Sequence, residues 1–225
     1  PQSVHVFGGY KVQARTRDLQ TANARLEALS FTDPLTGLHN RRYLSRQIPA
    51  DLSFYGRDAA YRAGEDVVVF ALLDVDHFKS INDTHGHAAG DRVLSQLGAL
   101  LTSLVRKGDY VARWGGEEFL LVLRPQPSGC ASQIGARLCS AINAHAFELD
   151  NVTRRRLTVS VGLVEHPLFP DTPDLLGWEQ MVTLADRALY RAKATGRNTW
   201  ASYRPRPGAR LPVGMPRLAA DPSWP

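Results

Sequence analysis

The feature that most constrains the fold is a stretch from residue 110 to residue 123, where two apolar segments flank a pair of glycines. Residues 111–114 and 119–123 are rich in β-branched, aromatic and apolar side chains, which favour strands. Gly115 and Gly116, between them, can adopt the positive φ angles that a tight hairpin turn needs. The stretch therefore predicts an antiparallel hairpin.

Two adjacent carboxylates, Glu117 and Glu118, follow the glycines directly. Like charges side by side repel each other and add nothing to packing. One interpretation is a solvated turn that happens to be acidic. The other is a cation site at the hairpin tip, where the glycines let a phosphate approach the backbone. This stretch by itself leaves both interpretations open.

Composition limits the class of protein. A chain of 225 residues is long enough for one domain with a real core plus appendages. Its two cysteines cannot build a disulfide framework, so we expect a reducing compartment and a cytoplasmic location. The longest apolar run, residues 67–73, is too short for a membrane span, which needs about 20 residues. No secretory signal is visible and the chain starts at Pro1, so we expect a piece of a longer protein, whose membrane anchoring the sequence leaves open.

The formal net charge of +5 raises the question of nucleic-acid binding. Residues 154–156 are consecutive arginines that we expect in a solvated loop before a strand, and no aromatic residues alternate with basic ones to form a stacking platform. We therefore expect no polymeric nucleic acid as partner. Much of the excess charge lies in the flanks of the chain: Arg15, Arg17, Arg204, Arg206, Arg210 and Arg217.

The two flanks differ in character from the centre. Residues 12–30 predict a helix with a narrow apolar stripe, either an ordinary helix of the domain or, as we favour, a dimerising stalk. Residues 204–225 are rich in proline and arginine and predict a flexible tail. We therefore divide the chain into a linker helix at 1–30, a globular domain at 31–203 and the tail.

The strongest strand signal is the continuous apolar run at residues 67–76, which predicts a central strand buried on both faces. The run ends with Asp74 and Asp76 on one face. A carboxylate at the end of a buried strand must be paired or must ligate a cation. Residues 77–83 predict a short helix whose N-terminal amides suit a phosphate.

The remaining elements give the fold class. Strands alternate with helices while the hairpin makes part of the sheet antiparallel, so we predict an α+β fold. If the strand end and the hairpin tip lie side by side, their carboxylates form an acidic cluster suited to a divalent metal and to phosphoryl chemistry on a nucleotide. We expect helices at 41–47, 91–106, 131–145 and 178–195 (ending at Gly196), loops at 50–65 and 84–90, and strands at 157–164 and 198–203.

The sequence resembles the GGDEF domain family, the diguanylate cyclases, over about residues 31–203. The resemblance rests on several motifs in order along the chain, which makes it specific. They are Asp33-Pro34-Leu35-Thr36-Gly37-Leu38 with Asn40-Arg41-Arg42; Asp74-Val75-Asp76-His77-Phe78-Lys79-Ser80-Ile81-Asn82-Asp83; Gly86-His87-Ala88-Ala89-Gly90-Asp91; Arg113-Trp114-Gly115-Gly116-Glu117-Glu118-Phe119; Ser160-Val161-Gly162; and residues 185–193 with Gly196-Arg197-Asn198.

The resemblance implies a five-stranded, mostly antiparallel central sheet surrounded by helices, similar to the palm of class III nucleotide cyclases. It implies that two GTP molecules are condensed to cyclic di-GMP with loss of two pyrophosphates. It also implies a homodimer with one GTP half-site in each subunit, Mg²⁺ or Mn²⁺ as cofactor, and an upstream sensory or receiver module.

The resemblance also assigns roles to individual residues. Asp74, the carbonyl of Val75, Glu117 and Glu118 would hold the metal, and Glu117 would help to deprotonate the ribose 3′-hydroxyl. The triphosphate would be bound by Lys79, Lys193 and Arg197 and by the amides of His77 and Phe78. Guanine would be read by Asn82 and Asp91, since a carboxylate can accept from its two adjacent N–H donors. His87 would either contact the base or shape the pocket.

Residues 106–109 have the Arg-x-x-Asp form of the family's inhibitory site for product, with Arg106 and Asp109 as its members and Arg137 on the basic surface that would complete it. The alternative is local: Arg106 caps the preceding helix, where a cation is favoured by about 0.3–1 kcal/mol, and Asp109 serves the turn.

One departure from the family pattern is visible: Glu117 stands where many members have Asp, although both forms occur with activity. Because no catalytic position is lost, an active enzyme is favoured. The alternatives are an idle module that senses GTP or cyclic di-GMP, and a purely dimerising module.

Overall fold

The computed structural model describes residues 31–205. The stalk expected in residues 1–30, and the tail beyond residue 205, lie outside this range. The elements, in chain order, are β1 (His39–Asn40), α2 (Arg41–Tyr55), α3 (Ala59–Arg62), β2 (Asp66–Val75), α4 (Phe78–His85), α5 (His87–Leu104), β3 (Tyr110–Gly115), β4 (Glu118–Pro127), α6 (Ala131–Ala144), β5 (Ala146–Glu148), β6 (Arg154–Arg156), β7 (Val159–His166), α7 (Trp178–Ala194) and β8 (Trp200–Tyr203).

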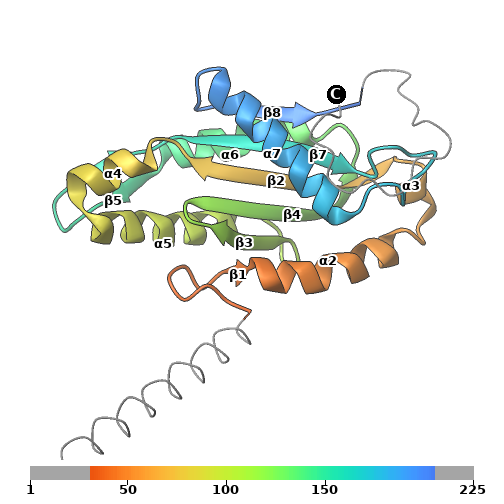
Figure 1. Cartoon of the computed structure of the whole chain (residues 1–225), viewed down its shortest axis with the longest axis horizontal. Helices are drawn as coiled ribbons and strands as arrows, with labels where there is room; N and C mark the ends of the chain where they lie inside the picture. The colour runs from red at the N-terminus through yellow and green to blue at the C-terminus, as the bar shows by residue number, and fades with distance from the viewer. Residues whose placement is uncertain (1–30, 206–225) are drawn as a thin grey trace, which may run out of the picture.

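A six-stranded mixed sheet, in the order β1-β3-β4-β2-β7-β8, forms the centre of the domain (Figure 1). The outer pairs β1–β3 and β7–β8 are parallel, whereas β3–β4, β4–β2 and β2–β7 are antiparallel. The predicted α+β class and mostly antiparallel sheet are confirmed. The resemblance implied five strands, whereas the sheet has six, because it also includes the two-residue β1.

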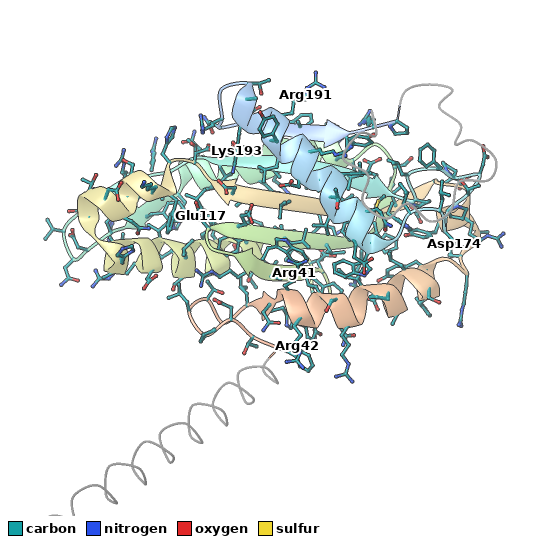
Figure 2. The ribbon with its side chains drawn as sticks, in the orientation of Figure 1. Arg41, Arg42, Glu117, Asp174, Arg191 and Lys193 are labelled. Atoms are coloured by element: carbon teal, nitrogen blue, oxygen red, sulfur yellow. The ribbon has the colours of Figure 1, made fainter. Side chains whose placement is uncertain are left out.

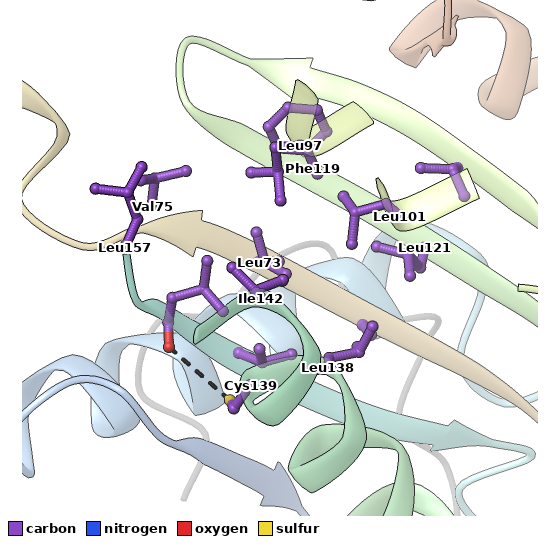
Figure 3. Packing of buried hydrophobic residues seen from close by; sticks show 14 of the residues in the cluster. Leu73, Val75, Leu97, Leu101, Phe119, Leu121, Leu138, Cys139, Ile142 and Leu157 are labelled. Atoms are coloured by element: carbon purple, nitrogen blue, oxygen red, sulfur yellow. Dashed lines mark hydrogen bonds between the residues drawn. The ribbon is translucent and has the colours of Figure 1, made fainter. Parts of the chain in front are cut away.

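The central strand β2 is buried on both faces, as its apolar run predicted. Successive side chains of a strand point to opposite faces, so Leu73 and Val75 pack with α4, α5 and α6, whereas Phe70 and Leu72 pack with α2, α3 and α7. Figure 3 shows the first of these two layers, in which Leu73 lies among residues of the neighbouring strands and helices. The sheet is therefore covered by helices on both sides.

The helix α7 lies unusually close to the sheet because β7 has a glycine at the contact. A Cβ at Gly162 would lie 2.0 Å from the Ala185 carbonyl oxygen and 2.2 Å from the Leu189 nitrogen. No larger residue fits without moving the helix. This contact fixes the line of α7 across the sheet, and α7 carries Lys193 toward the hairpin tip that bears Glu117 (Figure 2).

The loop expected at residues 50–65 is wrong, because α2 continues to Tyr55 and a short helix, α3, follows. Pro49 lies inside α2 and removes one backbone donor, but burial of Leu44 and Ile48 against the sheet outweighs this local loss. Asp58 caps α3 by accepting from the amides of Ala60 and Tyr61. Packing and capping together override the local loop signals.

The loop expected at residues 84–90 is also wrong. Only Gly86, with φ at +83°, separates α4 from α5, and Gly90 is a buried residue within α5. Residues 154–156 form β6, an exposed strand paired with β5, where a loop was expected. The helix α7 ends one residue earlier than expected, with Thr195 rather than Gly196 at its C-cap.

Two further findings bear on the expectations from composition. Cys130 and Cys139 are both free thiols, and burial raises the pKa of each to about 11. Among the helices within residues 31–205, none has both the length and the apolar character needed to cross a membrane.

Candidate active site

The hairpin tip and the end of the central strand lie side by side. Gly116 and Glu117 form the turn between β3 and β4, and Glu118 opens β4 directly opposite Asp74 of β2. Gly116 has a φ of +44°, whereas Gly115 stays outside the positive-φ region. Only Gly116 therefore has the positive φ angle that was expected of both glycines. The acidic cluster predicted from these two tips is thus brought together by sheet register.

Lys193 forms an ion pair with Asp74 in this cluster. Its Nζ lies 3.0 Å from Asp74 Oδ2, and the Asp74 side chain is 11% exposed. The residue comes from the last turn of α7, whose path is fixed at Gly162. Lys193 was expected on the triphosphate, and in this structure it is paired with Asp74.

Two carboxylates of the cluster, the buried Asp74 and the half-buried Glu118, have raised pKa values. For Asp74 the largest cause is burial, opposed by Lys193 and reinforced by the charges of Glu117 and Asp76. For Glu118 burial again comes first, followed by the charge of Asp74, with Lys193 opposing. A cluster in which neighbouring carboxylates raise one another's pKa values holds excess negative charge, which a cation would neutralise.

The donor set fits a hard divalent cation. Asp74, Glu117 and Glu118 offer carboxylate oxygens, and Val75, whose side chain is buried in the core, can offer only its backbone carbonyl. Within residues 31–205 no group of three His, Cys, Asp or Glu side chains is already arranged to hold a metal. Mg²⁺ usually keeps several waters and binds substrate phosphates beside one or two carboxylates, so a partial protein set of this kind suits it.

Asp76 lies at the same strand end as Asp74, but its carboxylate is already hydrogen-bonded within the fold. Its carboxylate accepts from the hydroxyls of Thr158 and Ser160, each at 2.7 Å, and from the backbone amide of Asn198 at 2.9 Å. These bonds hold β7 and the segment after α7 to the end of β2. Arg197, exposed and with φ at +62°, is thereby kept next to the strand end, and its role toward a triphosphate stays a prediction.

The turn after the central strand leads directly into α4. His77 precedes α4 in the left-handed region, at φ 57° and ψ 28°, and it makes no side-chain capping bond. Phe78 is buried in the core, so its backbone amide is the group available to a ligand. Lys79 is exposed on the first turn. Amides at the start of a helix beside a cation suit an anion, and the assignment of phosphate to them stays a prediction.

The residues expected to read guanine lie on two helices that pack against each other. Asn82 belongs to α4, and Asp91 and His87 belong to the first turns of α5. His87 and Asp91 are exposed and four residues apart, so they share one helix face. Asn82 is half-buried, and its Oδ1 is buried without a hydrogen-bond partner among the described residues.

At the expected inhibitory site, Asp109 serves the turn. Its carboxylate accepts from the amides of Arg106 and Arg124, each at 2.9 Å. The Arg106 side chain is exposed, and so is that of Arg137 on α6.

Two arginines at the hairpin escaped the sequence reasoning. Arg113 binds Asp33 and the Gly116 carbonyl. Arg124 donates to the Lys107 carbonyl at 2.6 Å. Arg113 and Asp33 both occur in the motifs quoted above, but nothing in the sequence pairs two residues so far apart. Arg124 lies outside every motif.

The acidic tips, the turn between β2 and α4 and the helix pair beside them define a nucleotide-cyclase type of α+β domain. The chain belongs to the GGDEF domain family, since the family model described as "Diguanylate cyclase, GGDEF domain" matches residues 30–199.

Similar proteins agree with this family. The chain is 38% identical over 176 residues to Response regulator PleD of Caulobacter vibrioides, covering 76% of this chain and 35% of that protein. It is 36% identical over 191 residues to Diguanylate cyclase DgcP of Pseudomonas aeruginosa, covering 84% and 26%. The chain thus spans about a third or less of the length of these relatives.

Solved structures show the same fold. Diguanylate cyclase SiaD of Pseudomonas aeruginosa, solved in complex with its activator SiaC, superposes with a TM-score of 0.66 at 33% identity, covering 88% of this chain and 72% of that one. The GGDEF domain of DgcB from Caulobacter crescentus, solved in complex with c-di-GMP, gives 0.63 at 28% identity, covering 77% and 95%.

Proposed function

We propose that residues 31–203 form a diguanylate cyclase domain, which condenses two GTP molecules to cyclic di-GMP and releases two pyrophosphates. The observation that carries the proposal is the register of Asp74 against Glu118, with Glu117 at the adjoining turn. This register concentrates carboxylates at one point beside a turn suited to phosphates. Relatives named as diguanylate cyclases share the family.

Different residues of the chain bind the triphosphate, bind guanine and accept the proton. The amides of His77 and Phe78, with Lys79 and Arg197, hold the triphosphate, while Asn82 and Asp91 hold guanine. Lys193 leaves Asp74 and turns to the phosphates as substrate enters, because charge on the transferring phosphoryl group attracts it. Glu117 takes the proton of the ribose 3′-hydroxyl. When bound, Mg²⁺ or Mn²⁺ neutralises phosphate charge and lowers the pKa of that hydroxyl.

The reaction also requires two copies of the domain. Each copy has one set of these residues, yet the product joins two nucleotides symmetrically, which suits a two-fold homodimer with one GTP in each half-site. GTP is a cytoplasmic substrate, so we place the domain on the cytoplasmic side, under the control of an upstream sensory or receiver module.

The test is incubation of the full chain with GTP and Mg²⁺, followed by chromatographic separation of the nucleotides. We expect cyclic di-GMP and pyrophosphate in a one-to-two ratio, with specific activity that rises with protein concentration. ATP in place of GTP and the Asp74→Asn variant are the matched controls, and neither should yield product. A folded wild-type dimer that binds GTP without forming any dinucleotide would favour the idle, nucleotide-sensing module instead.

A further inference from the structure

The contact between α4 and α5 depends on Gly90. This residue is buried within α5 and faces α4, where its missing side chain leaves a space. A Cβ built at Gly90 would lie 2.0 Å from Asn82 Oδ1 and 3.0 Å from Phe78 Cζ. The amide of Asn82 therefore already fills the volume that any larger residue at position 90 would need.

The Asn82 amide has an unmet hydrogen-bonding capacity at this contact. Its Oδ1 is buried and has no hydrogen-bond partner within residues 31–205. Buried polar atoms in folded proteins are nearly always paired, so an unpaired amide calls for an explanation. Within residues 31–205 no hydrogen bond to Oδ1 holds the amide in place, and the close approach of Gly90 restricts where this oxygen can lie.

We propose that Gly90 is a positioning residue for nucleobase selection and acts through Asn82. By leaving room for the amide, it seats Asn82 next to Asp91, the residue that follows Gly90 on the same helix. An alanine at position 90 would displace the amide before it separated the helices, because its Oδ1 has no hydrogen bond to break within residues 31–205. The inference deepens the proposed function, since it rests on guanine being read by Asn82 and Asp91.

The test compares Gly90→Ala, Asn82→Ala and the double variant in the full chain. The probes are guanosine 5′-(α,β-methylene)triphosphate and its adenosine counterpart with Mg²⁺, and binding is measured by calorimetry. Gly98→Ala is the matched control, because Gly98 is another buried glycine of α5, where a Cβ would lie 3.1 Å from Leu38 Cδ1, on a different contact.

We expect Gly90→Ala to weaken guanosine binding about ten-fold while hardly changing adenosine binding, as the loss of one polar contact to the base would. Asn82→Ala should cause a similar loss, and the double variant no further loss, because both changes remove one interaction. The double variant should also recover the thermal stability that Gly90→Ala loses, since the overlap is gone. Gly98→Ala should retain the wild-type preference for guanosine.

Three results would overturn the proposal. The first is wild-type preference for guanosine in Gly90→Ala, and the second is a further ten-fold loss in the double variant relative to Asn82→Ala. The second comparison remains decisive even where Gly90→Ala alone does not fold. The third is a wild-type chain that does not prefer the guanosine probe. These probes cannot react, so their binding tests base selection separately from catalysis. A chain that prefers the guanosine probe but forms no cyclic di-GMP from GTP would contradict only the proposed condensation reaction.

Discussion

Arg113 and Asp33 form an ion pair across 80 residues of sequence, with the Arg113 Nη1 3.3 and 3.2 Å from the two carboxylate oxygens of Asp33. The Arg113 Nε also donates to the Gly116 carbonyl at 3.0 Å. The side chains are 19% and 16% exposed. One guanidinium thus joins the loop that begins the domain to the turn that carries Glu117.

Arg113→Lys should lower the free energy of unfolding by about 1–2 kcal/mol, because lysine cannot reproduce the fork that serves Asp33 and Gly116 together. Turnover should fall further than stability suggests, since the position of Glu117 depends on this turn. Urea unfolding and initial rates check the two effects. Arg155→Lys, an exposed change on β6, is the control. An Arg113→Lys variant with wild-type rates would show that the turn keeps its shape without the fork.

The sequence predicted the parts of this site that depend on local pattern. The apolar run of β2, the hairpin and the helix faces follow from periodicity, and the acidic cluster follows from the places of Asp74 at the end of β2 and Glu118 at the start of β4. It failed where tertiary packing outweighs local signals. Gly86 and Gly90 predicted a loop, yet a turn of one residue suffices and Gly90 is needed inside a helix contact.

Pairings between distant residues were beyond the sequence for a different reason. The bonds of Asp76 to Ser160 and Asn198, and of Arg113 to Asp33, join segments that only the folded sheet brings together. Periodicity says which face a side chain occupies but not which partner it meets. The partner of Lys193 was likewise unpredictable, because the approach of α7 depends on the closeness of contact at Gly162.

Metal-free stability should fall as pH rises above the ordinary carboxyl pKa of about 4. Burial raises the pKa of Asp74 and of Glu118, so the folded state keeps protons that the unfolded chain has released. Their contribution to stability is complete below the unfolded pKa and is lost as pH rises through the folded values. Melting temperatures in EDTA across this range measure the loss.

Asp74→Asn should flatten that pH profile, because one of the two titrating groups is gone. Mg²⁺ added to the wild type at neutral pH should raise its melting temperature, since a cation bound to the folded state stabilises it. Asp171→Asn, at an exposed position before α7, serves as control and should keep the wild-type slope. An equally steep decline in Asp74→Asn would mean that the Asp74 carboxylate is not one of the groups whose titration lowers the stability.

Glu117→Gln should abolish turnover while keeping the fold. The change is nearly isosteric, but it removes a ligand charge and the base that we assign to the 3′-hydroxyl, so we expect a loss of at least about 10²-fold. The melting temperature without metal should be unchanged or slightly higher, because repulsion with Glu118 and Asp74 is relieved. Initial rates and a thermal scan on one preparation test both statements. Turnover within a few-fold of wild type would remove Glu117 from the reaction.

The last prediction concerns product inhibition at residues 106–109. Asp109 is a poor probe, because its carboxylate holds the amides of Arg106 and Arg124 and any change there disturbs the turn. Arg106 is the sharper probe, since its side chain is exposed and its planar fork can bridge a guanine and a phosphate of cyclic di-GMP. Bound product would then join this turn to a basic surface that includes Arg137 and hold two active sites apart.

Arg106→Ala should keep the initial rate with GTP but need about ten-fold more cyclic di-GMP for half-inhibition. Lys107→Ala removes a neighbouring exposed charge and should be inhibited like the wild type, so equal inhibition of all three proteins would place the inhibitory site elsewhere.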